Sequence, residues 1–142
     1  MIQVFAKVLT IRPDGQLLVL RRSADDERRA GEWDFPGGGV EAGESPNQGA
    51  ARELMEEAGI TLDPQDLTLV YAETTYYSPT ADSNTRVLFM ARVSDEQAAK
   101  VTLSHEHEAY KWQTPELAAS EHPHPVYRAG LQYVLEHKLQ KV

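Results

Sequence analysis

Three glutamates stand close together along one predicted helix, and they are the residues of this chain best suited to chemistry. Glu53, Glu56 and Glu57 occupy positions i, i+3 and i+4, so their side chains project from the same side of an α-helix. Like-charge repulsion between Glu53 and Glu57, one turn apart, costs roughly a few tenths of a kcal/mol. A hard divalent cation removes this repulsion, and an oxygen-only cluster favours Mg²⁺ or Mn²⁺ over zinc. The pattern therefore indicates a carboxylate metal site, with a solvated charged face as the simpler alternative.

The helix that carries these glutamates has clear start and stop signals. Ser45 suits the N-cap, Pro46 the first helical position, and Gln48 completes a capping box with Ser45. Gly59 provides the stop. A second side of the helix is expected to pack in the core, with Asn47, Ala50, Ala51, Leu54 and Ala58. Arg52 is placed to pair with Glu56 and lies to one side of the other two glutamates.

Residues 38–60 match the signature of the Nudix hydrolases, G-x5-E-x7-R-E-U-x-E-E-x-G-U, in which U is a bulky apolar residue. The specified positions are filled by Gly38, Glu44, Arg52, Glu53, Leu54, Glu56, Glu57, Gly59 and Ile60. The preceding WDFPGG segment, residues 33–38, is similar to the family's usual lead-in. The short chain and this lead-in resemble the mutator-type nucleoside triphosphate pyrophosphohydrolases of the family.

The resemblance implies a role for each polar residue of the signature. The implied metal ligands are Glu53, Glu56 and Glu57. The glycines 37–39 permit close backbone approach, so a backbone carbonyl there, at Gly38, is a further candidate ligand; for Gly37 and Gly39 a tight turn into the helix is the alternative. Either Glu53 or Glu57 is expected to orient or deprotonate the attacking water. Arg52 and Glu44 are expected to hold the glutamates in place, as residues behind a metal site generally do. For Glu44 the alternative is a carboxylate favoured by the nearby helix N-terminus, and both interpretations are compatible.

A second group of polar residues, His105, Glu106, His107 and Glu108, lies further along the chain. Family members often supply another glutamate from this distance beyond the signature, as a metal ligand or a base. Glu106 and Glu108 are both candidates, and Glu106 is slightly favoured. The two histidines are predicted to be solvated loop residues and not zinc ligands, because the neighbouring donors are hard oxygens. His122 and His124 are predicted to lie in a loop before the last helix.

Substrate contacts are predicted from arginines and aromatic residues outside the signature. Arg21 and Arg22 end a predicted strand and are placed to reach a phosphate, although alternation along the strand turns at least one outward. Arg28 and Arg29, in the following loop, are weaker candidates. The aromatic residues able to stack a base are Phe35, Tyr76, Tyr77 and Phe89. Core packing is the alternative for aromatic residues in strands.

The remaining pattern predicts one α/β (α+β) domain over residues 1–142. Strands are expected at residues 4–11, 16–21, 67–76, 86–93 and 108–113, the first two forming a hairpin about residues 13–15. Residues 23–31 and 77–85 are expected to be loops. Short helices are expected to start near residues 94 and 114, and a last helix spans residues 126–139. This order suits an α/β/α sandwich with a mixed central sheet, which the resemblance implies as well.

Composition limits the partners. The chain of 142 residues has a net charge of −8, which disfavours broad binding to nucleic acid, and it contains no cysteine for disulfides or thiol chemistry. No segment suits a signal peptide or a membrane span, and a cytoplasmic location is expected. The resemblance implies a Mg²⁺-dependent hydrolase, with Mn²⁺ as a possible substitute, that cleaves a nucleoside triphosphate to monophosphate and pyrophosphate.

The sequence is also compatible with other substrates and with a non-catalytic function. The alternative small substrates are ADP-ribose and dinucleoside polyphosphates. A further alternative is hydrolysis at the triphosphate end of an RNA. A nucleotide sensor without turnover is less favoured, because every catalytic position of the signature is filled. Relatives in the family are often dimers, so a homodimer is a further expectation.

Overall fold

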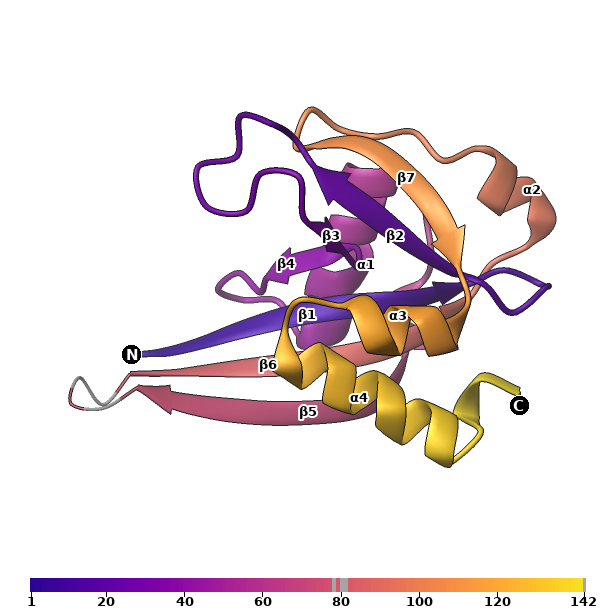
Figure 1. Ribbon diagram of the computed structural model, residues 1–142. Helices are drawn as coiled ribbons and strands as arrows, with labels where there is room; N and C mark the ends of the chain where they lie inside the picture. Colours follow the sequence, from indigo (N-terminus) through magenta and orange to yellow (C-terminus); the bar gives the residue numbers. More distant parts are fainter. Residues whose placement is uncertain (78, 80–81, 142) are drawn as a thin grey trace.

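The computed structural model describes residues 1–77, 79 and 82–141 and has a mixed β-sheet between helices (Figure 1). The strands are β1 (Ile2–Ile11), β2 (Leu17–Arg22), β3 (Trp33–Asp34), β4 (Gly37–Gly39), β5 (Thr68–Tyr77), β6 (Asp82–Arg92) and β7 (His107–Gln113). The helices are α1 (Pro46–Ala58), α2 (Asp95–Ala99), α3 (Pro115–Glu121) and α4 (Pro125–Glu136), with 3-10 turns at Pro64–Asp66 and Leu139–Lys141.

The sheet divides into two parts that separate from a common point. Its strand order is β3-β2-β1-β6-β5, with β7 paired to β2 and β4 paired to β1. Strand β1 runs parallel to β6 along its whole length but meets β2 at Ile11↔Leu17. Towards its start, β1 pairs with the glycines of β4 instead. The strands β2 and β7 therefore diverge from β1, β6 and β5, and β4 lies between the two parts (Figure 1).

Helices cover both faces of this sheet, which confirms the predicted sandwich. One buried cluster joins α1 to the sheet through Leu54, Val8 and Phe89. A second cluster lies on the other face, where Leu131 and Val134 of α4 pack with Leu88. Figure 1 shows α1 on the far side of the strands, and α3 with α4 on the near side.

Helix α1 begins and ends where its sequence predicts. The Ser45 side chain accepts a hydrogen bond from the Gln48 N–H, and the Gln48 side chain accepts one from the Ser45 N–H. Gly59 ends the helix at φ +72°, a left-handed conformation that glycine adopts without a steric cost. The position of the glutamates is therefore fixed by local signals at both ends of the helix.

Two predicted boundaries were wrong. Residues 82–85 belong to β6 and not to a loop, because Ser83–Thr85 pair with Ile2–Val4 of β1 although their side chains are polar. The rest of the expected 77–85 loop includes residues 78, 80 and 81, which lie outside the described residues. The last helix ends at Glu136, earlier than the apolar pattern suggests, and Lys138 then takes a positive φ of 54°.

Among the residues described, no helix combines the length and the apolar character needed to span a bilayer.

Candidate active site

A cleft of about 270 Å³ lies where the two parts of the sheet separate, and it brings both signs of charge together. Its three acidic residues come from α1 and from the turn just before β7, and its basic residues come from β1, β2, β6 and the loop after β2. The lining residues are Phe5, Lys7, Arg22, Arg29, Gly37, Gly38, Gly39, Glu53, Glu57, Arg86, Glu106 and Tyr127.

Helix α1 places its glutamates against the glycine strand β4. Glu57 is buried, and its Oε1 accepts a hydrogen bond of 2.7 Å from the Gly37 N–H. Glu53 lies against Gly38, where an added Cβ would come within 2.8 Å of the Glu53 Oε1. Glycine at position 38 therefore leaves the space that the Glu53 carboxylate occupies.

The three glutamates are not presented equally, which corrects the prediction of one open carboxylate face. The Glu57 side chain is 4% exposed and that of Glu53 is 16% exposed, whereas that of Glu56 is 56% exposed. Glu57 thus lies on the packed side of α1 as much as on its polar side. At 100° per residue, Glu57 lies at the edge of the polar side of the helix. The sequence alone therefore did not show whether its side chain packs in the core or faces solvent.

Arg52 joins the glutamates into one network. Its guanidinium donates to both carboxylate oxygens of Glu44, at 2.8 and 3.1 Å. It also donates to Glu53 at 3.1 Å and to Glu56 at 3.3 Å. The expected pairing with Glu56 is present, but Arg52 bonds Glu53 as well and does not lie to one side of it. A fifth bond, to the Gly39 carbonyl, ties the network to β4.

Burial and neighbouring charges shift Glu53 and Glu57 toward their neutral form. The pKa of Glu57 is raised to about 7, chiefly by burial and also by the charges of Glu53 and Glu106, against the opposing effects of Lys7 and of the Gly37 N–H. Burial also raises the pKa of Glu53, and the nearby charges of Glu56 and Glu106 add to this effect, while Arg52 opposes it. The carboxylates are thus close enough to repel one another.

Glu106 and Glu108 lie in different surroundings. Glu106 lines the cleft and acts on the pKa of both Glu53 and Glu57. Glu108 instead forms an ion pair with Arg21, at 3.4 Å between the Glu108 Oε1 and the Arg21 Nε. The geometry therefore favours Glu106 as the additional glutamate of the site.

The donor set fits a hard divalent cation. The donors are all oxygen atoms, from the carboxylates of Glu53, Glu57 and Glu106 and from the backbone carbonyls of β4. The carboxylates repel one another, and a bound cation would relieve this repulsion. Over the part of the chain that the structure describes, no three acidic or histidine side chains converge tightly enough to coordinate an ion as they stand. Arg52 donates to one oxygen of Glu53 and to one oxygen of Glu56, so the second oxygen of each carboxylate has no hydrogen bond from Arg52.

A buried charge network, absent from the sequence predictions, lies behind the glutamates. Lys7 is 5% exposed, and its Nζ lies 3.1 Å from the Asp34 Oδ2 and 3.1 Å from the Gly37 carbonyl oxygen. On the other side of Asp34, the His122 Nε2 lies 2.8 Å from the Oδ1. Burial opposes the ionisation of Asp34, but Lys7 and His122 outweigh it and hold its pKa well below the usual range. A single lysine within the apolar first strand was the sequence signal for this network.

The two predicted strand-end arginines separate as alternation requires. Arg22 lines the cleft, with its Nη1 3.3 Å from Asp26 and its Nη2 3.7 Å from Asp34. The Arg22 Nε is buried and has no hydrogen-bond partner among the described residues. Arg21 is paired with Glu108 away from this lining. Of the two weaker candidates, Arg29 lines the cleft and Arg28 does not.

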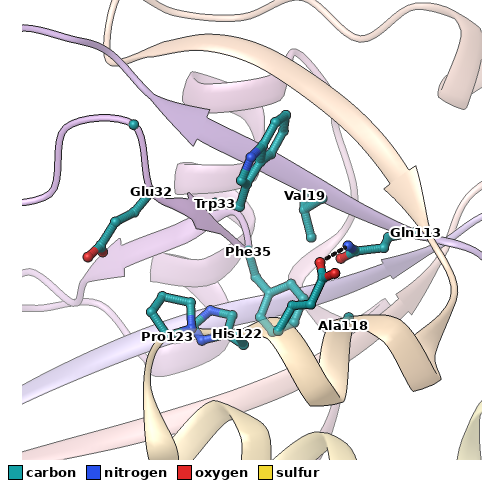
Figure 2. Close-up of a pocket in the computed structure, with 10 residues that line it drawn as sticks. Val19, Glu32, Trp33, Phe35, Gln113, Ala118, His122 and Pro123 are labelled. Atoms are coloured by element: carbon teal, nitrogen blue, oxygen red, sulfur yellow. Dashed lines mark hydrogen bonds between the residues drawn. The ribbon is translucent and has the colours of Figure 1, made fainter.

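The predicted aromatic stack is corrected. Phe35 is 1% exposed and stacks on His122 with ring centroids 4.8 Å apart. It borders a separate cavity of about 210 Å³, where Figure 2 shows it below Trp33 and Val19 and beside His122. Tyr76 is 79% exposed on the edge strand β5 and does not line the cleft.

Other residues supply the aromatic surface of the cleft. Phe5 of β1 and Tyr127 of α4 line it, and neither was predicted. The sequence did not indicate that Phe5 lines a cleft, because an aromatic residue in an apolar strand most often packs in the core. Tyr127 is 3% exposed.

Three histidines lie in more ordered surroundings than predicted. His107 is buried at the start of β7, with its Nδ1 3.8 Å from the Glu57 Oε2. Burial, with Arg22 and Lys7 nearby, lowers the pKa of His107 to about 4, so the ring is neutral at pH 7. His122 is buried, and its Nδ1 accepts a hydrogen bond from the His124 N–H. His124 caps α4 by accepting from the Val126 N–H.

Comparison with known proteins gives one consistent result. The family model described as NUDIX domain matches residues 1–132. A MutT-like protein of Streptomyces ambofaciens is 46% identical over 67 residues, 47% of this chain and 40% of that protein. The CTP pyrophosphohydrolase of Escherichia coli (strain K12) is 32% identical over 118 residues, 83% of this chain and 79% of the relative.

The fold has close counterparts as well. The crystal structure of a MutT protein from Methanosarcina mazei Go1 has a TM-score of 0.77 and 30% identity, and each chain covers 96% of the other. The chain spans less than half of the length of the Streptomyces protein, so that match concerns only a part of it. The model match over residues 1–132 extends well beyond the signature and includes both parts of the sheet. The chain therefore belongs to the Nudix family.

Proposed function

We propose that this protein is a Mg²⁺-dependent pyrophosphohydrolase that cleaves a nucleoside triphosphate to a monophosphate and pyrophosphate. The observation that carries this proposal is the division of one cleft into an acidic side at Glu53, Glu57 and Glu106 and a basic side at Arg22 and Arg29. A polyphosphate and its metal require both charges at close quarters. Nudix hydrolases generally depend on a divalent metal, and the E. coli relative is named a CTP pyrophosphohydrolase.

Each residue has a part in the proposed chemistry. The proposed metal ligands are Glu53, Glu56, Glu57, Glu106 and the Gly38 carbonyl. Bound Mg²⁺ supplies neutralisation of the phosphate oxygens. We assign Glu57 as the base, because in the metal-free protein burial raises its pKa to about 7, a value that suits proton transfer near neutral pH. Arg22 lines the cleft and binds a phosphate, and Arg52 with Glu44 holds Glu53 in position.

The proposal is tested by product analysis. Wild-type protein with Mg²⁺ is incubated with the common nucleoside triphosphates, ADP-ribose, diadenosine tetraphosphate and a triphosphate-ended RNA. We expect monophosphate and pyrophosphate from at least one triphosphate. The Glu53→Gln, Glu57→Gln double variant is the matched control. Equal product from wild type and this variant on every compound would refute the enzymatic function, and preferential turnover of the RNA would replace the substrate class.

Arg22 and Arg21 offer a direct comparison of neighbouring arginines. Arg22→Gln is expected to lower kcat/KM by roughly tenfold to a hundredfold, because a charge-assisted hydrogen bond to phosphate is lost. Arg21→Gln is expected to stay close to wild type, since Arg21 pairs with Glu108 outside the cleft. Steady-state kinetics on the best triphosphate check both variants. A larger loss from Arg21→Gln would show that the assignment of the two arginines is reversed.

A further inference from the structure

The turn that carries Glu106 lies just before β7, so the bonds of the turn itself decide where the carboxylate is held. Glu106 is an exposed residue of this turn. Its N–H donates to the Ser104 Oγ at 3.3 Å, and the His107 N–H donates to the Ser104 carbonyl at 3.3 Å. A bond of 3.4 Å also runs from the Ser104 N–H to the Glu57 carbonyl. All three bonds are long, so they hold Glu106 only weakly.

The shorter bonds to this turn come from Ser23, which directly follows β2. The Ser23 Oγ donates to the His105 carbonyl at 2.7 Å, and the Ser23 N–H donates to the Glu106 carbonyl at 3.0 Å. These two carbonyls belong to the peptide groups on either side of the Glu106 Cα. Because a peptide group is planar, holding both groups fixes the backbone dihedral angles of Glu106. Ser23 therefore sets the direction in which the Glu106 side chain leaves the backbone.

Ser23 is joined to the basic side of the cleft as well. It follows Arg22 in the chain, and its carbonyl accepts a hydrogen bond of 3.1 Å from the Asp26 N–H. The Asp26 side chain accepts from the Arg29 N–H at 2.7 Å and from the Arg22 Nη1 at 3.3 Å. Both arginines line the cleft. Ser23 thus lies between the arginine side of the cleft and the turn that carries Glu106.

We propose that Ser23 is a positioning residue for metal binding, and that it directs the Glu106 carboxylate into the cleft through the two peptide groups beside it. This inference rests on the proposed function, because it requires Glu106 to be a metal ligand. Loss of the Ser23 hydroxyl frees the peptide group before Glu106, and the carboxylate then spends less time where it can bind a cation. Ser23 does not line the cleft, so its effect passes through Glu106.

The experiment is a double-variant cycle measured by Mn²⁺ binding. Electron paramagnetic resonance of the free ion gives the dissociation constant of Mn²⁺ without substrate. Ser23→Ala removes the hydroxyl, Ser23→Thr keeps one, and Glu106→Ala removes the carboxylate to be positioned. The Ser23→Ala, Glu106→Ala protein completes the cycle. Ser120→Ala is the matched control, because the Ser120 Oγ donates to the Leu117 carbonyl at 2.9 Å on α3, outside the cleft.

We expect Ser23→Ala to weaken Mn²⁺ binding roughly tenfold, the lower end of the effect of residues that hold a metal ligand. Ser23→Thr and Ser120→Ala should stay close to wild type. Glu106→Ala should weaken binding more, and adding Ser23→Ala to it should cause no further loss, since no carboxylate remains to be positioned. Unchanged affinity in Ser23→Ala would overturn the inference. An equal loss from Ser23→Ala with and without Glu106 would overturn it too, because Ser23 would then act elsewhere.

Kinetics separate this role from a contact with the substrate. With the best triphosphate, Ser23→Ala should need a higher Mg²⁺ concentration for half-maximal kcat. Saturating Mg²⁺ should restore kcat and leave the KM for the triphosphate unchanged, because Arg22 and Arg29 remain in place. A raised KM at saturating Mg²⁺ would assign Ser23 to phosphate binding and overturn the inference.

Failure of the proposed function is distinguishable from failure of this inference. Mn²⁺ binding does not require turnover, so the cycle is measured even where no hydrolysis occurs. An effect of Ser23→Ala that depends on Glu106, without product from any triphosphate, would end the enzymatic proposal and leave the role of Ser23 intact. Hydrolysis by wild type, with equal Mn²⁺ affinity in wild type and Ser23→Ala, would do the reverse.

Discussion

Glu57→Gln is expected to lower kcat by roughly 10²- to 10⁴-fold, the usual contribution of a positioned general base. The glutamine can still accept the hydrogen bond from the Gly37 N–H that Glu57 accepts at 2.7 Å, so the position of the side chain is preserved. The substitution removes the negative charge and the ability to take a proton. Steady-state kinetics with Mg²⁺ on the best triphosphate measure this loss.

The same substitution is expected to leave folding stability intact or to raise it. Burial raises the pKa of Glu57 to about 7, above the value of about 4.3 expected in the unfolded chain. The ionised carboxylate therefore destabilises the native state progressively as pH rises from about 4 to above 7, by up to about 4 kcal/mol without metal. Glutamine is neutral at every pH and carries no such penalty. The gain in the free energy of unfolding should be larger at pH 8 than at pH 5.

Urea unfolding in EDTA at these two pH values provides the check. Glu56→Gln is the matched control, because this neighbour on α1 has a side chain that is 56% exposed and should change stability little at either pH. A Glu57→Gln protein that is less stable than wild type at pH 8, with full activity, would contradict both the electrostatic argument and the assigned role.

Local signals account for the parts of the site that the sequence predicted well. The cap at Ser45 and the stop at Gly59 concern residues near one another in the chain, and the structure places them as expected. Arg52 and Glu44 are likewise eight positions apart and joined by two hydrogen bonds. The sandwich fold also followed from the order of strands and helices.

Other parts of the cleft depend on pairings between distant segments. Arg86 faces the cleft because β1 and β6 pair in parallel, a register that no local pattern specifies. The same pairing makes a strand of the polar residues 82–85. Tyr76 has strong strand propensity but lies on the outer strand β5, so propensity alone could not show whether it faced substrate or solvent. His107 was misjudged because its acidic neighbours suggested solvent, while its alternate position in β7 turns it inward.

Asp34→Asn is expected to destabilise the protein by about 3–5 kcal/mol, the effect of removing one partner of a buried ion pair. Asp34 is 3% exposed and carries the negative charge that faces Lys7 at 3.1 Å, with Arg22 and Arg29 within 3.8 Å. Asparagine leaves these cations without a buried counter-charge. Urea unfolding at pH 7 measures the loss.

The pH dependence of this loss follows from the pKa of Asp34. Lys7 and His122 hold the pKa of this carboxyl well below its usual range, whereas in the unfolded chain it is about 3.9. The stabilisation is therefore fully present above about pH 4 to 5 and is lost as pH falls below the unfolded value. The difference between wild type and Asp34→Asn should shrink in the same direction.

A double-variant cycle separates the ion pair from general damage to the core. Lys7→Met alone also leaves a buried charge short of its partner, so the Lys7→Met, Asp34→Asn protein should lose less stability than the sum of the two single variants. Asp14→Asn is the surface control: Asp14 pairs with Arg12 at 2.9 Å in solvent and should matter little. Strict additivity of the two core substitutions would show that Lys7 and Asp34 do not stabilise each other. Because Lys7 also contacts the Gly37 carbonyl oxygen, and the Gly37 N–H bonds Glu57, coupling here would mean that the charge network that stabilises the core also positions the proposed base.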